Sequence, residues 1–172
     1  MLRPAISHRV GGVEMIPPGG ADVVFRFLGM VHSADTNCWD LLDGNLRVCL
    51  AQGWLSRERA PEEGRDERAA VLGSSLSRDP VIAEMLSALL ERWAHVYADL
   101  GGRPCLVSGT RIVALDMERV MVTREDFAGS YQADAQIPAH SFITRLFSGQ
   151  WYIAATSRRL PTPGWPPTER EL

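Results

Sequence analysis

The chain has 172 residues, 45% of them hydrophobic, and a formal net charge of −3, which is the size and composition of one globular domain with a substantial core. A charge so close to neutral argues against nucleic acid as a partner, and the lack of a run of about 18 apolar residues argues against a transmembrane helix. All 18 basic residues are arginine, which excludes a Schiff-base lysine, a phosphate-loop lysine and a serine–lysine catalytic pair.

Residues 1–19 are rich in glycine and proline and lack the apolar segment of a secretion signal. We therefore expect a flexible N-terminal arm on a cytoplasmic protein with no membrane partner. The three cysteines, Cys38, Cys49 and Cys105, do not follow a metal-binding spacing. They are expected to be small buried side chains rather than reactive thiols.

Apolar residues recur at helical spacing through the first half of the chain. The pattern predicts helices over residues 21–32, 37–42, 46–55 and 67–76. Asp43-Gly44 is expected to interrupt the chain between the second and third of these helices, because Asp-Gly is a strong turn signal. The mixed charges of residues 56–66 predict a solvent-exposed loop.

The stretch from Asp79 to Gly101 predicts the longest helix and the centre of the fold. Asp79 is a favourable N-cap, Pro80 suits the first helical position, and Gly101 suits a left-handed C-cap. One face carries eight apolar side chains, each contributing roughly 1.5–3 kcal/mol when buried: Ile82, Met85, Leu86, Leu89, Trp93, Val96, Tyr97 and Leu100. We expect this helix to lie in the hollow of a sheet formed by the C-terminal third of the chain.

Beyond Gly102 the apolar residues alternate with a period of about 2, which predicts strands. We expect strands over residues 104–107 and 111–123, with a connection over residues 124–138. A β-hairpin is expected to join residues 141–147 and 151–157 around the turn Ser148-Gly149-Gln150.

The predicted domain covers residues 20–160, and residues 161–172 form a proline-rich tail. Four of the first seven residues of this tail are proline, which excludes a central strand. Two interpretations stay open. The tail is either a strap that packs Trp165 against the domain or a polyproline segment that another protein binds.

Helices followed by antiparallel strands indicate an α+β fold. Seven segments of the chain carry a resemblance to a particular family within the α+β class. They lie at residues 34–43, 46–47, 50–54, 117–120, 142–146, 150–154 and 163–168. The most distinctive of them is Pro163-Gly164-Trp165-Pro166-Pro167. In these segments the chain resembles small actinobacterial proteins of unassigned function in the nuclear-transport-factor-2-like (NTF2-like) superfamily, also called SnoaL-like or cystatin-like α+β cone proteins.

The resemblance implies an NTF2-like cone, in which N-terminal helices pack in a curved antiparallel sheet with a pocket at the wide end. Some members of this superfamily are isomerases, cyclases, dehydratases or hydrolases with a catalytic Asp or His inside the cone. Many others only bind ligands or proteins. No residue of this chain aligns with those catalytic positions, so no catalytic residue is carried over.

Eight residues are candidates for lining such a pocket: Asp35, Trp39, Trp93, Tyr97, Asp116, Glu118, His140 and Tyr152. Asp35 and Trp39 form either a pocket mouth or an N-cap and a core residue. Asp116 and Glu118 lie two residues apart on one predicted strand, where they suit either paired acid–base work or salt bridges to arginine.

Two histidines are candidates of different kinds: His95 as a base, because a neutral imidazole beside a carboxylate accepts a proton near pH 7, and His140 as a residue that overhangs the pocket. His95 lies on the predicted long helix, where a surface position is the alternative. His140 precedes the predicted hairpin, where a loop position is the alternative.

Two classes of function follow from these observations. The first is a non-catalytic module without a cofactor, which binds a small apolar ligand or a protein and forms a homodimer through the open sheet face. It predicts an interior lined by apolar groups, without paired titratable residues. The second is a cofactor-independent isomerase, cyclase or dehydratase with an acid–base residue in the pocket. A role in protein secretion or conjugation machinery is compatible with the fold, but no motif supports it.

Overall fold

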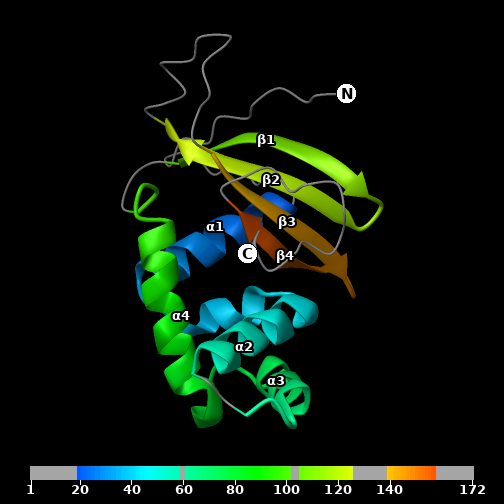
Figure 1. Cartoon of the computed structure of the whole chain (residues 1–172). Helices are drawn as coiled ribbons and strands as arrows, with labels where there is room; N and C mark the ends of the chain where they lie inside the picture. Colours follow the sequence, from blue (N-terminus) through cyan, green and yellow to red (C-terminus); the bar gives the residue numbers. More distant parts are fainter. Residues whose placement is uncertain (1–18, 59–60, 102–104, 126–138, 158–172) are drawn as a thin grey trace.

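The computed structural model describes residues 19–58, 61–101, 105–125 and 139–157 of the chain (Figure 1). The predicted tail lies outside the described residues, as does the predicted arm apart from Gly19. The helices are α1 (Gly20–His32), η1 (Thr36–Leu41), α2 (Gly44–Arg57), α3 (Arg65–Ser74), η2 (Pro80–Ile82) and α4 (Ala83–Val96). The strands are β1 (Cys105–Ala114), β2 (Met117–Arg124), β3 (His140–Phe147) and β4 (Gln150–Ser157).

The four strands form one open antiparallel sheet in the order β1-β2-β3-β4, and the helices lie on one side of it (Figure 1). The α+β class expected from the sequence is therefore confirmed, and the arrangement is consistent with a cone-like fold. Among the described residues, no helix combines the length and the apolar character that crossing a bilayer requires.

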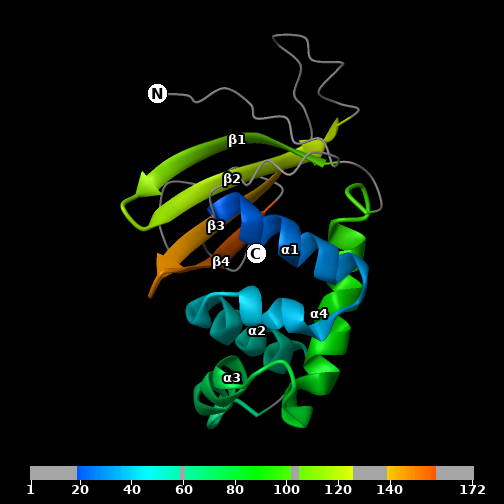
Figure 2. The same cartoon turned by 180° about the vertical axis from the view of Figure 1, so that it is seen from behind.

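Helix α1 lies across the covered face of the sheet (Figure 2). It buries Val23, Val24, Phe27 and Val31, which recur at helical spacing as the sequence predicts. Its first residue, Gly20, approaches the sheet so closely that a Cβ atom would overlap with Thr144. Glycine at this position therefore allows the helix to rest directly on β2 and β3.

The predicted helix over residues 79–101 is shorter than expected. Asp79 accepts a hydrogen bond from the amide of Val81 at 3.0 Å, so it caps the segment as predicted, but η2 precedes α4. Helix α4 ends at Val96, and Tyr97 accepts hydrogen bonds from the amides of Leu100 and Gly101. Gly101 does not have a positive φ, so the prediction of a left-handed cap there was wrong.

The apolar face of α4 is buried, but not in the hollow of the sheet. Ile82, Met85, Leu86 and Leu89 are each no more than 1% exposed. They belong to a core shared with α1 and η1, and α1 is the helix that covers the sheet. The expectation that the long helix occupies the hollow was therefore wrong for most of its length, because an amphipathic face specifies burial without specifying the surface opposite.

The expected long strand over residues 111–123 is in fact a hairpin. Residues Leu115-Asp116 form the turn between β1 and β2, and β1 also includes residues 105–107 of the short strand expected over 104–107. The second hairpin is confirmed, with a two-residue turn. Ser148 and Gly149 have φ values of 50° and 80°, which is the signature of a type I′ turn.

Residues 42–43, which precede α2, pair with the edge strand β4 of the sheet. Leu42 forms a bridge with Ile153 of β4, and the amide of Asp43 donates to the Ile153 carbonyl at 2.7 Å. The Asp43 carboxylate accepts from the amide of Asn45 at 2.9 Å. Asp43 therefore acts as the N-cap of α2, and the Asp-Gly pair starts a helix as well as ending the preceding segment.

Candidate functional site

Four aromatic rings fill the space where the end of α4 meets α1 and β3. Phe27 lies with its ring centroid 5.2 Å from that of Trp93, 6.0 Å from that of Tyr97 and 6.3 Å from that of Phe142. Tyr97 and Phe142 are stacked at 5.7 Å. Each of these side chains is no more than 5% exposed. The predicted pocket residues Trp93 and Tyr97 therefore belong to a tightly packed interior.

His140, the first residue of β3, extends this cluster with a polar group. Its Nε2 atom lies 2.9 Å from both carboxylate oxygens of Asp99, which follows α4. The imidazole is 2% exposed and meets the Tyr97 ring edge-on at a centroid distance of 5.2 Å. Its Nδ1 atom is buried and has no hydrogen-bond partner among the residues that the structure describes. A carboxylate thus orients the ring through one of its two nitrogens.

The phenol of Tyr97 is hydrogen-bonded to the hydroxyl of Thr156 on β4. Burial raises the pKa of Tyr97, and the hydrogen bond to Thr156 opposes this effect only in part. The phenol is therefore neutral at physiological pH. We call four contacting polar residues the buried polar cluster, although Asp99 and Thr156 at its edge are only partly buried: Tyr97, Asp99, His140 and Thr156.

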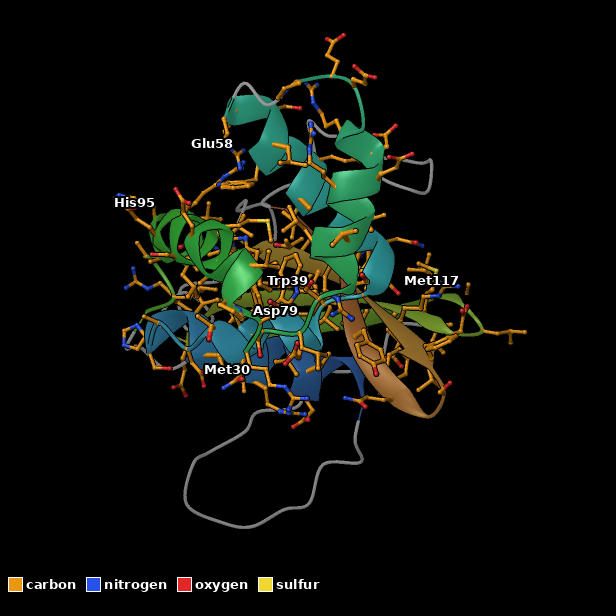
Figure 3. All side chains as sticks on the ribbon, turned by 90° about the horizontal axis from the view of Figure 1, so that it is seen from below. Met30, Trp39, Glu58, Asp79, His95 and Met117 are labelled. Atoms are coloured by element: carbon orange, nitrogen blue, oxygen red, sulfur yellow. The ribbon has the colours of Figure 1, made fainter. Side chains whose placement is uncertain are left out.

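Asp35 and Trp39 have structural roles at the start of η1. The Asp35 carboxylate accepts from the amide of Asn37 at 2.9 Å and caps the helix. Trp39 is fully buried between the helices (Figure 3), and its indole N–H donates to the carbonyl of Ser75 at 3.0 Å. These contacts agree with the cap-and-core interpretation.

Asp116 and Glu118 do not form an acid–base pair. Asp116 lies in the β1–β2 turn, with its Oδ2 atom 3.4 Å from Nε of Arg145. The Glu118 carboxylate instead accepts from the amide of Gly20 at 3.3 Å, where it complements the N-terminus of α1. The contact of Asp116 with Arg145 agrees with the salt-bridge interpretation, and Asp116 lies in the turn rather than on the strand that carries Glu118.

Two further candidates lie away from the interior cluster. Tyr152 is paired across the ladder with Arg145 and is half-buried, on the opposite face of the sheet from Phe142. His95 is exposed and points away from the body of the protein (Figure 3). The structure thus groups three of the eight predicted pocket residues, Trp93, Tyr97 and His140.

The cysteines occupy three different environments. Cys38 is fully buried, and burial, with smaller contributions from the Asp35 and Asp40 carboxylates, raises its pKa to about 12. Cys105 is half-buried, whereas Cys49 is exposed, so the prediction of a buried side chain was wrong for Cys49. Within the described ranges, no three metal-ligating side chains lie close enough together to hold an ion.

A surface feature that the sequence did not predict lies at one end of the sheet. Exposed apolar side chains lie in or beside both hairpin turns, with exposed fractions from 36% to 106%. We call these residues the sheet end: Ile112, Val113, Leu115, Leu146 and Phe147. The unbroken apolar run over residues 112–115 was the available signal, since a half-buried strand alternates apolar and polar residues.

No protein-family model, curated protein or solved structure matches this chain.

Proposed function

We propose that the chain is a non-catalytic interaction module of the NTF2-like class, and that the sheet end is its binding surface. The observation that carries this proposal is the exposure of Leu115 at 106% in the β1–β2 turn and of Phe147 at 63% at the end of β3, beside the β3–β4 turn. Large exposed apolar side chains that gather in one region are typical of sites that bind another protein. The α+β order and the helix across the sheet support the NTF2-like class.

The packing of the interior favours this surface over an internal ligand site. Phe27, Trp93 and Phe142 fill the space between α1, α4 and β3, with ring separations typical of a close-packed core. A small apolar ligand would have to displace at least one of these rings. The sheet end needs no such rearrangement, because its apolar groups are already in contact with solvent.

Site-specific photocrosslinking in the source cells tests the proposal. A benzophenone amino acid is placed at Val113 in the sheet end or at Val71 on α3, which are 55% and 60% exposed. The proposal predicts a discrete protein adduct from position 113 and none from position 71. Equal labelling from both positions, or none from position 113, would contradict it.

A second candidate function, cofactor-independent acid–base catalysis, is favoured by the buried polar cluster. Asp99 and His140 form a titratable pair, which a purely apolar interior would not contain, and within the described ranges Nδ1 of His140 has no hydrogen-bond partner. A carboxylate that orients a histidine in this way is a common arrangement for a general base.

Nitrogen-15 NMR of the histidine rings tests this second candidate with a panel of small ketones as probes. Catalysis at this site predicts that a probe shifts the His140 ring signals and leaves those of the exposed His95 unchanged. If every probe leaves His140 unaffected, or shifts both rings alike, small molecules do not reach the cluster and the candidate is excluded.

A further inference from the structure

The side of the sheet that faces away from the helices carries residues that the proposed function does not use (Figure 2). Glu118 of β2 accepts from the amide of Gly20 in α1, and Val120 belongs to the core shared with the helices, so both face the helices. Successive side chains of a strand point to opposite faces, so Arg119 faces away from the helices. We call this side the outer face and use the name for five residues: Arg111, Met117, Arg119, Ile143 and Tyr152.

Arginine occupies two directly opposite positions of the outer face. Position 111 of β1 is paired with position 119 of β2, and both are arginine. The Cβ atoms of opposite residues in an antiparallel pair lie about 4.5–5.5 Å apart, and like charges at such positions destabilise the pair. A negative charge held between the two guanidinium groups would turn this repulsion into attraction.

The guanidinium of Arg119 lacks an acceptor in the described part of the chain. Within residues 19–58, 61–101, 105–125 and 139–157, its Nε atom is buried and has no hydrogen-bond partner. Glu118, the adjacent acid, is on the other face of the sheet, and Asp116 lies beside Arg145 at 3.4 Å. An unpaired buried N–H group costs free energy, so a bound anion would stabilise this position by supplying the acceptor.

The groups around Arg119 on the outer face are largely apolar. Ile143, which is paired with Arg119, is 3% exposed, and Met117 packs against it. Tyr152, two strands away from Met117 in the same ladder row, is half-buried. Apolar surroundings lower the local dielectric constant and so strengthen the attraction between a guanidinium group and an anion.

We propose that the outer face binds a phosphate monoester. Arg111 and Arg119 hold the phosphate group, because the planar guanidinium fork matches phosphate oxygens. Met117 and Tyr152 contact the apolar body of the ligand. A phosphate monoester carries a charge of roughly −1.5 to −2 at pH 7, which balances two arginines, whereas a carboxylate carries only one charge. The inference does not rest on the proposed function, since no residue of the outer face belongs to the sheet end.

A small phosphorylated molecule fits this surface better than a membrane or a nucleic acid does. Both of the latter are bound by extended clusters of basic residues. The next arginine on this side of the sheet, Arg145, lies within 3.8 Å of Asp43 and 3.4 Å of Asp116, which interrupt any such cluster. The formal net charge of the whole chain is −3.

Calorimetric titration of the full chain with phenyl phosphate tests the inference. We expect saturable binding with a Kd of about 1 mM or tighter. Inorganic phosphate should compete but bind more weakly, because it has no apolar body. Benzoate keeps the ring but has one charge, and it should bind at least about tenfold more weakly. No saturable binding of phenyl phosphate, or equal affinity for all three probes, would overturn the inference.

Substitution of single arginines locates the site. Arg119→Gln and Arg111→Gln should each weaken the binding of phenyl phosphate at least about tenfold. The matched control is Arg26→Gln, which removes an exposed arginine from α1 on the other side of the sheet and should leave the affinity unchanged. Thermal unfolding shows whether each variant is folded. If folded Arg119→Gln binds as the unaltered chain does, or if Arg26→Gln weakens binding equally, the inference fails.

NMR titration of the unaltered chain keeps the inference testable should the Arg119 variants not fold. Phenyl phosphate should shift the Nε–Hε signal of Arg119 and the backbone amides of residues 117–121 and 141–145, and it should leave those of α3 unchanged. Shifts spread evenly over the chain, or absent from the Arg119 signal, would overturn the inference. Such a failure leaves the interaction module standing, because photocrosslinking at position 113 reports on the sheet end separately.

Discussion

The Nε2 atom of His140 lies 2.9 Å from both carboxylate oxygens of Asp99, so this ion pair or charge-assisted hydrogen bond ties the first residue of β3 to the turn after α4. The imidazole is 2% exposed and Asp99 is 25% exposed. The contact thus links the segment after α4 to the sheet at the edge of the buried interior. We therefore expect its loss to lower the free energy of unfolding of the whole domain.

Replacing Asp99 with asparagine should lower the free energy of unfolding by about 1–3 kcal/mol, because a buried imidazole loses a charged partner. Urea denaturation measures the change. Glu91→Gln, at an exposed position of α4, is the control and should stay within about 0.5 kcal/mol of the unaltered chain. Equal effects of the two substitutions would show that the Asp99–His140 contact does not stabilise the fold.

Tyr97 should not ionise in the folded protein at pH values where an exposed tyrosine does. Burial raises its pKa above the value of about 10 for an unfolded chain. Its contribution to stability is therefore complete below about pH 10 and is lost as the pH rises from there toward the folded pKa.

Absorbance at 295 nm, read at about pH 11 with circular dichroism as a check of folding, tests this expectation. Tyr97→Phe should leave the tyrosinate signal of the folded protein unchanged. In urea it should remove one third of the signal, since the chain has 3 tyrosines. A decrease in the folded protein would mean that the Tyr97 hydroxyl is open to solvent.

The two glycines of α1 should respond in opposite directions to alanine. At Gly20 a Cβ atom would overlap with Thr144 and lie 2.9 Å from the Glu118 carboxylate, so Gly20→Ala should cost about 1–3 kcal/mol through overpacking. At Gly29 no atom of the described residues outside the helix backbone lies within 4 Å of the position of a Cβ atom. Gly29→Ala should therefore gain roughly 0.5–1 kcal/mol of helix propensity. Thermal and urea unfolding measure both, and similar responses would contradict the close contact between α1 and the sheet.

The cysteines should differ in their reaction with a thiol reagent such as Ellman's reagent at pH 8. Exposed Cys49 should react fast, whereas Cys38, with its pKa raised to about 12 by burial, should react only on unfolding. Cys49→Ser should remove the fast phase, and Cys38→Ser should leave it. A fast reaction of Cys38 would mean that η1 opens readily in the native state.

The elements that local patterns define were predictable from the sequence. The spacing of Val24, Phe27 and Val31 defines α1, and the turn around Ser148-Gly149 defines the second hairpin. The first hairpin was missed because the apolar run of residues 112–115 continues up to its turn. A turn within such a run leaves no interruption in the hydrophobic pattern, and Asp116 alone was too weak a signal.

Contacts between distant segments were not predictable from local patterns. Asp99 and His140 are 41 residues apart, and their contact depends on how the chain passes from α4 to β3. The apolar face of α4 indicated burial but not that α1 would lie between most of α4 and the sheet. The candidate site was therefore predicted in part: Trp93, Tyr97 and His140 do meet, but Asp99 and Thr156 came to light only in the folded structure.

Site-specific photocrosslinking at the sheet end tests most directly whether it is a binding surface. The account predicts a discrete protein adduct when the benzophenone amino acid is at position 113 and none when it is at position 71, although both positions are exposed. Equal labelling from both positions, or none from position 113, would contradict it.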